Sequence, residues 1–148
     1  MDKRFMPYWF DGSAGIGTVL CRLGKLFSNR TYVEIAEQLT DSSFCAFAVC
    51  PGQTNGLAGI LELVTDMLSL TGKAKYQWYQ QEMVSGLTEY AIHQDDGGIA
   101  FPGQFCTRIS NDFGTGSAGI GMALFRCQNP VLRTFIDFNL PSGKFLIS

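Results

Sequence analysis

Apolar residues recur at three- and four-residue intervals in three separate segments, which predicts three helices with one apolar face each. The first segment carries this pattern at Ile16, Val19, Leu20, Leu23 and Leu26. The second carries it at Ile60, Leu63, Val64, Met67 and Leu70, and the third at Ile120, Ala123, Leu124 and Cys127. Additional apolar residues widen each stripe, so we expect these helices to be mostly buried.

A second helix is expected behind each of these three. Thr31 and Glu34 have capping-box spacing, which opens a helix behind the first segment. Gly72 ends the second apolar helix, and residues 73–92 form its longer partner. Asn129 followed by proline opens a short third partner that ends near Phe138.

The chain is therefore expected to form three αα-hairpins, at about residues 12–40, 54–92 and 114–139. Strand signals are weak. Residues 44–49 are apolar and are interpreted as a buried approach to the second hairpin rather than a strand. Residues 93–115 are interpreted as a long glycine-rich loop, in which the single histidine, His93, is solvated.

A glycine motif stands at the start of each apolar helix. The sequence GSAGIG at residues 12–17 recurs letter for letter at 116–121, and GLAGIL at 56–61 is closely related. Small residues at a helix start allow backbones to approach closely. They also leave N–H groups that can face an anion or a polar ligand. The sequence leaves both interpretations, packing and ligand binding, open.

Composition excludes several classes of protein. The chain has 148 residues, of which 46% are hydrophobic and 16% charged, which argues against disorder. A net charge of −2 gives no basic surface for nucleic acid, and no apolar run is long enough for a membrane span. The five cysteines lack C-x-x-C spacing and no signal peptide precedes them, so we expect reduced thiols in a cytoplasmic protein.

The glycine motifs and their flanks resemble the lanthionine synthetase C-like family, whose inner helices begin with G-x-[AP]-G. Residues 9–15 (WFDGSAG) resemble the family segment W-C-Y-G-x-P-G, and residues 54–59 (TNGLAG) resemble C-H-G-x-A-G. Residues 112–119 (DFGTGSAG) are closest in style to the cyclase domains of class III lanthipeptide synthetases. The resemblance covers nearly the whole chain, from about Tyr8 to Phe125.

This resemblance implies an all-α fold, namely a partial α/α toroid of three αα-hairpins with G-x-A-G motifs at the inner-helix starts. Residues 1–148 would then form one partial cyclase domain, the C-terminal part of a bacterial enzyme's toroid. Repeats of this kind bury their faces against neighbours. We therefore expect apolar surface at both ends of the arc, covered by the remainder of a synthetase or by another copy of the chain.

The zinc-dependent members of the family bind the metal through one cysteine of the first segment and a Cys-His pair of the second. Phe10, Thr54 and Asn55 stand at those positions here. Zinc takes Cys, His or carboxylate ligands. The resemblance to class III synthetases therefore implies a cyclase with no metal and no other cofactor.

The family reaction adds a peptide cysteine thiol to dehydroalanine or dehydrobutyrine and forms a thioether. It needs a thiolate, a proton for the enolate carbon and stabilisation of the enolate oxygen. Asp11 and Asp112 each precede a glycine motif and are the candidate acid and base. Their alternative role is to accept hydrogen bonds as helix caps. The candidates for binding the precursor peptide are Arg4, Tyr8, Trp9, Gly12, Thr54, Asn55, Gly56, Thr115 and Gly116.

Two other functions remain open. The first is a non-catalytic helical repeat module that binds a precursor peptide. A glycan-processing toroid would use paired carboxylates, for which Asp11 and Asp112 are the available pair.

Overall fold

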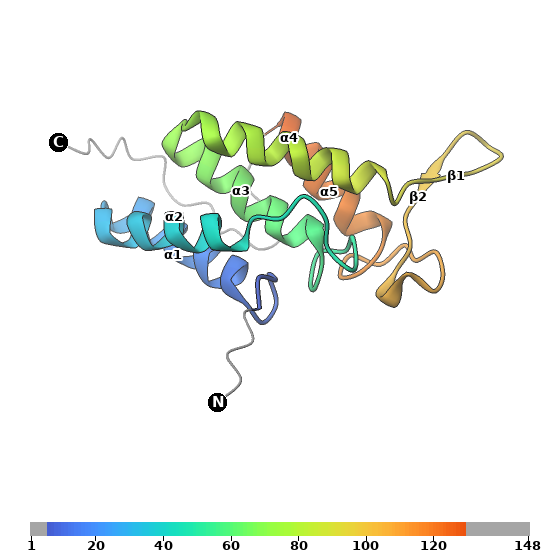
Figure 1. Cartoon of the computed structure of the whole chain (residues 1–148), viewed down its shortest axis with the longest axis horizontal. Helices are drawn as coiled ribbons and strands as arrows, with labels where there is room; N and C mark the ends of the chain where they lie inside the picture. Colours follow the sequence, from blue (N-terminus) through green and yellow to red (C-terminus); the bar gives the residue numbers. More distant parts are fainter. Residues whose placement is uncertain (1–5, 130–148) are drawn as a thin grey trace.

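Three helices begin directly after the first glycine of the three motifs, as the sequence predicts. The computed structural model describes residues 6–129. The three helices are α1 (Ser13–Phe27), α3 (Leu57–Thr71) and α5 (Ser117–Gln128). Two further helices, α2 (Arg30–Ser43) and α4 (Ala74–Thr88), follow α1 and α3 and pack against them as hairpins (Figure 1). The partner helix expected after Asn129 lies outside the described residues.

The start of α2 differs from the predicted capping box. Asn29 is the N-cap, and its side-chain oxygen accepts hydrogen bonds from the backbone N–H groups of Thr31 at 2.9 Å and Tyr32 at 3.4 Å. The helix therefore begins before Thr31, and Glu34 pairs with Arg30 instead. Asn29 thus satisfies the Thr31 donor that the capping box was expected to serve, together with the donor of Tyr32.

The loop after α4 contains a small sheet that the sequence did not predict. The helix ends at Thr88 rather than Ile92, and β1 (Ile92–His93) pairs antiparallel with β2 (Ile99–Ala100). A short 3-10 turn, η1 (Gln104–Cys106), follows. Strands of two residues are too short to show an alternating pattern. His93 is exposed within β1, which confirms the expectation that it is solvated. No helix in residues 6–129 is both long and apolar enough to cross a membrane.

The first two glycines of each motif lie against a backbone carbonyl six residues before them. A Cβ on Gly15 would lie 2.0 Å from the Trp9 oxygen, and one on Gly59 would lie 2.0 Å from the Gln53 oxygen. Gly119 stands in the same relation to Phe113, at 1.9 Å. The first glycine of each motif likewise approaches the carbonyl of Met6, Cys50 or Ser110. The chain therefore folds tightly back over the starts of α1, α3 and α5, which we call the inner helices.

The same fold-back uses N–H groups at the helix starts. Ser13 N donates to Met6 O at 2.9 Å, Leu57 N to Cys50 O at 3.0 Å, and Ser117 N to Ser110 O at 2.8 Å. These donors are satisfied by the chain itself. Of the two interpretations that the sequence leaves open, packing is therefore the one that these close contacts and hydrogen bonds favour.

Helix α3 lies between α1 and α5 and forms the centre of the core (Figure 1). Most residues of α3 are buried, and the buried residues lie on all faces of the helix. Helix α1 is different, because Ile16 and Val19 of its apolar stripe are exposed. Residues 44–49 also differ from the expected buried approach, since Phe47 and Val49 point to solvent.

Charged side chains at equivalent positions along α1, α3 and α5 join these three helices through ion pairs. Asp66 of α3 accepts from Arg22 of α1 at 2.9 Å and from Arg126 of α5 at 2.7 Å. Arg126 also pairs with Glu62, and both side chains are buried. Removing one partner of a buried ion pair leaves the other charge in a low-dielectric interior.

We predict that Gly59→Ala lowers the free energy of unfolding by about 3 kcal/mol, because the new methyl group overlaps backbone that cannot move aside. Gly121→Ala is the matched control, since Gly121 lies inside α5 with nothing within 4 Å of its Cβ position. That variant should gain about 0.5–1 kcal/mol. Urea unfolding measures both, and equal stability of the two variants would contradict the packing role.

We predict that Arg126→Ala costs about 3–5 kcal/mol of stability, because Glu62 and Asp66 lose the cation between them. Arg30→Ala removes an exposed pair with Glu34 and should cost about 0.5 kcal/mol or less. Thermal unfolding of the two variants gives the comparison. A cost for Arg126→Ala as small as that for Arg30→Ala would show that the buried carboxylates need no cation.

Candidate functional site

The segments before the three glycine motifs meet through backbone hydrogen bonds. Phe10 N donates to Thr54 O at 3.0 Å, and Thr54 N donates to Gly114 O at 2.8 Å. Each of these residues stands two positions before the first glycine of its motif. Equivalent positions of the three repeats are therefore joined in series, and we call this the junction of Phe10, Thr54 and Gly114.

Two predicted site residues lie together beside the junction. The hydrogen-bonding surroundings of Asn55 place its amide nitrogen 2.9 Å from Thr54 O and 3.3 Å from Asp11 Oδ1. Both side chains are exposed, so the Asp11 carboxylate is held by Asn55 and remains open to a ligand. The Thr54 hydroxyl donates to Gly114 O at 3.0 Å and is thereby committed to the junction.

Tyr8 lies on the same side of the molecule, half-buried, at the edge of the core. Burial, together with nearby Cys45, Cys50 and Asp11, raises the pKa of its phenol. Tyr8 therefore stays protonated at neutral pH and can donate a hydrogen bond. Trp9 packs between the repeats, because its Cβ lies 2.7 Å from the position that a Cβ on Gly59 would take.

Sequence reasoning missed the gathering of thiols near Tyr8. Burial, Cys106, Cys50 and Cys45 raise the pKa of Tyr90, and its hydroxyl donates to Ala48 O. The Cys106 thiol donates to Val49 O at 3.6 Å. Cys106 comes from a segment far from Cys45 and Cys50 in the chain, so no spacing could have indicated that the three meet.

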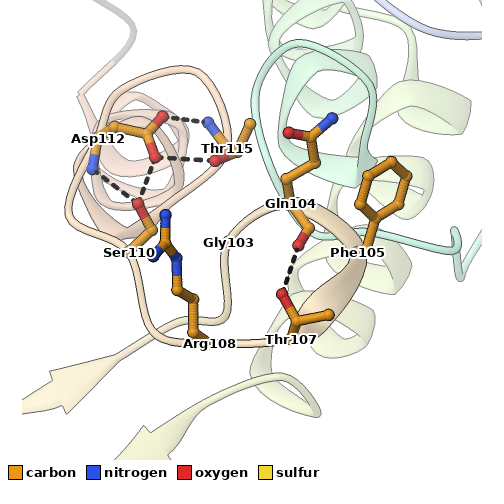
Figure 2. A pocket seen from close by; sticks show the side chains of 8 residues that line it. All are labelled: Gly103, Gln104, Phe105, Thr107, Arg108, Ser110, Asp112 and Thr115. Atoms are coloured by element: carbon orange, nitrogen blue, oxygen red, sulfur yellow. Dashed lines mark hydrogen bonds between the residues drawn. The ribbon is translucent and has the colours of Figure 1, made fainter.

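Asp112 is held in a closed set of hydrogen bonds, shown in Figure 2. Its carboxylate accepts from the Ser110 hydroxyl, from Thr115 N at 2.6 Å and from Thr115 Oγ1 at 2.8 Å. These bonds favour the ionised form and lower the pKa of Asp112 to about 2. Asp112 thus acts as the acceptor that fixes the loop before α5.

A cavity of about 450 Å³ opens beside Asp112 (Figure 2). Arg108 and Gln104 line it together with Phe105, whose backbone is left-handed at φ 56°. The lining residues come from the loop of residues 93–115, and among them Asp112 and Thr115 also belong to the family-like segment 112–119. The site therefore includes an arginine and an exposed aromatic that the sequence analysis did not single out.

Asp11 faces a different hollow, of about 820 Å³, which runs along the start of α1. Trp9, Phe10, Ile16, Val19 and Arg22 are among its lining residues. The structure therefore brings Asp11, Thr54 and Asn55 together and places Asp112 and Thr115 at a separate cavity. Gly12, Gly56 and Gly116 are the N-caps of α1, α3 and α5, and each lies against the carbonyl six residues before it. Arg4 lies outside the described residues.

Two matches to known proteins each cover most of this chain. The sequence profile of "Lanthionine synthetase C-like protein" matches residues 2–140 of the chain. A protein described as "Probable SapB synthase", from Streptomyces coelicolor, is 30% identical over 122 residues, which are 82% of this chain and 13% of that protein. The chain thus spans only a small part of that relative's length. From the match over nearly its whole length, the chain belongs to the lanthionine synthetase C-like family.

Proposed function

We propose that the chain is the cyclase part of a lanthionine synthetase, which adds cysteine thiols of a precursor peptide to dehydroalanine or dehydrobutyrine. The observation that carries the proposal is the junction, which gathers Asp11, Thr54 and Asn55 from two repeats at one exposed place. The membership of the chain in the lanthionine synthetase C-like family and its similarity to a probable SapB synthase support the same reaction class.

The chemistry needs one proton to move and no co-reactant. The thiol proton passes to Asp11, and the sulfur electron pair forms the C–S bond to the β-carbon of the dehydro residue. The enolate then takes a proton back at its α-carbon, so the product has the mass of the reactants. Asn55 holds the Asp11 carboxylate in place, and the protonated Tyr8 phenol is a nearby donor for a peptide carbonyl.

We propose that no zinc ion takes part. The side chains at the family's three ligand positions do not fit zinc, since Phe10 offers no donor atom and Thr54 gives its hydroxyl proton to Gly114 O. The Asn55 amide nitrogen faces Thr54 O and Asp11. Activation of the thiol therefore falls to Asp11.

The alternative, a peptide-binding module without catalysis, is favoured by the cavity beside Asp112. A carboxylate with a pKa of about 2 is a weak base, whereas Arg108 and Phe105 beside it suit binding to peptide carbonyls and side chains. Glycan hydrolysis is less well supported, because Asp11 and Asp112 line separate cavities rather than flanking one bond.

We predict that the chain speeds the loss of free thiol from a peptide holding one cysteine and one dehydroalanine, without change of mass. Asp11→Asn should slow this reaction by about 100-fold, as expected when a general base is removed. Asp95→Asn, a matched change in the turn between β1 and β2, should leave the rate unaltered.

Mass spectrometry and thiol titration measure this reaction, and addition of EDTA should leave the rate unchanged. If the wild-type rate is no faster than the spontaneous reaction while the chain still binds the peptide, the cyclase proposal is overturned in favour of the peptide-binding module. Loss of activity in EDTA, restored by zinc, would overturn the proposed absence of the metal.

We predict that Asp112 contributes stability that disappears only in strong acid. Its pKa in the folded chain, about 2, lies below the ordinary value of 3.8, so folding favours the ionised form. The contribution is complete above about pH 4 and is lost as the pH falls towards 2. The stability difference between wild type and Asp112→Asn should therefore be constant from pH 7 to 5 and shrink below pH 4. An NMR titration placing this carboxyl near 3.8 would contradict it.

A further inference from the structure

Two of the five cysteines, Cys50 and Cys106, meet although they lie in distant parts of the chain. The Cys106 thiol donates to Val49 O at 3.6 Å, and it also shares a hydrogen bond with the Cys50 thiol. Cys106 is exposed and Cys50 is half-buried, so one thiol of the pair is directly open to solvent. A covalent bond between the two sulfur atoms therefore needs only a small side-chain movement.

The backbone of the loop after β2 brings the Cys106 thiol to this contact. Phe105 and Cys106 are successive residues other than glycine in the left-handed region, at φ 56° and φ 55°. Such residues are uncommon and are kept only where the surrounding structure holds them. Here Cys106 N donates to Gly103 O at 3.0 Å and Gly103 N donates to Arg108 O at 2.8 Å, which closes the loop around the cysteine (Figure 2).

The segment that carries Cys50 is anchored as well. Cys50 O accepts from Leu57 N at 3.0 Å, and the three residues after Cys50 are all buried. The two segments also touch at a second place, because a Cβ on Gly52 would lie 2.7 Å from Thr115 Cα. The contact between the thiols thus belongs to the packing of the two segments and does not rest on one side-chain rotamer.

The other cysteines do not share this contact. Cys21 and Cys127 belong to α1 and α5. Burial alone raises the pKa of Cys45, with no contribution from another thiol. Within residues 6–129 there is no group of three His, Cys, Asp or Glu side chains that could hold a metal ion. The chemistry open to Cys50 and Cys106 is therefore that of a thiol pair.

We infer that Cys50 and Cys106 are a redox-active pair, which a small-molecule disulfide such as glutathione disulfide converts to an intramolecular disulfide. The exposed Cys106 thiolate attacks one sulfur of the oxidant, which forms a mixed disulfide and releases one thiol. The Cys50 thiolate then attacks the Cys106 sulfur and releases the second thiol. The protein loses two hydrogen atoms, and the oxidant is reduced to two thiols that carry them. The inference is independent of the proposed reaction.

The bond would join two parts of the candidate site. Cys106 directly follows Phe105, which lines the cavity beside Asp112. Cys50 is one of the groups that, after burial and Cys45, raise the pKa of the Tyr8 phenol. Oxidation would therefore tie the loop that forms this cavity to the segment near Tyr8, and reduction would release it.

The test treats the full reduced chain with glutathione disulfide and then alkylates the remaining thiols. Mildly alkaline buffer is used, because burial and Cys50 raise the pKa of Cys106 and keep the thiol protonated at neutral pH. Three of the five cysteines should be alkylated, and the chain should lose the mass of two hydrogen atoms. Digestion with trypsin should give peptide 31–73 joined to peptide 76–108.

Serine variants assign the bond, because Cys45 and Cys50 lie in the same tryptic peptide. Cys50→Ser and Cys106→Ser should each abolish the joined peptides, whereas the matched control Cys45→Ser should retain them. Oxidation should raise the midpoint of thermal unfolding of the wild type by about 5 °C or more. The same treatment should leave the midpoint of Cys106→Ser unchanged, and this variant alters only an exposed side chain.

Several results would overturn the inference. Five alkylated cysteines after treatment, or glutathione that stays on Cys106 without a cross-link, would show that the two thiols do not react with each other. Joined peptides in Cys50→Ser would assign the partner to Cys45, and a covalent dimer on a non-reducing gel would assign it to another molecule. Equally selective pairing in concentrated urea would show that the fold does not direct the bond.

Discussion

The close approach between motif glycines and the carbonyls six residues before them is the constraint on which this fold depends. At Gly15, Gly59 and Gly119 the added Cβ of any other residue would lie about 2 Å from an oxygen atom. The approach folds each preceding segment over its helix start, where its carbonyls accept the helix N–H groups. One backbone geometry, repeated three times, thereby fixes where the inner helices begin and how the segments before them lie.

The candidate site is a consequence of this geometry. Because the fold-back is the same in each repeat, residues two positions before the motif arrive side by side and form the junction of Phe10, Thr54 and Gly114. The next residue of each repeat then projects from the junction, which brings Asp11 beside Asn55. The contact between them crosses two repeats, and neither hairpin contains it alone.

The sequence predicted those parts of the molecule that a local pattern encodes. The starts of the inner helices followed from the glycine motifs, and the hairpins followed from long apolar periodicities. The two-residue strands carry too little pattern, and the Asn29 cap competes with an equally plausible capping box. The exposure of Ile16 and Val19 is set by how the helices pack against one another, which periodicity alone does not specify. Asp112 was identified, but the bonds that lower its pKa come from Ser110 and Thr115 and required coordinates.

Because the junction is built from backbone groups, the residue types at its positions can change while the fold persists. The junction is made mainly by N–H and C=O groups, which Phe10 and Thr54 supply as well as cysteine would. The level deeper in the helices is made by side chains instead, where Arg22, Asp66 and Arg126 stand ten residues after each motif begins. There the charges must alternate from repeat to repeat, since like charges on neighbouring helices would repel. The junction thus depends less on the identity of its side chains than the charged level does, where the side chains themselves hold the repeats together.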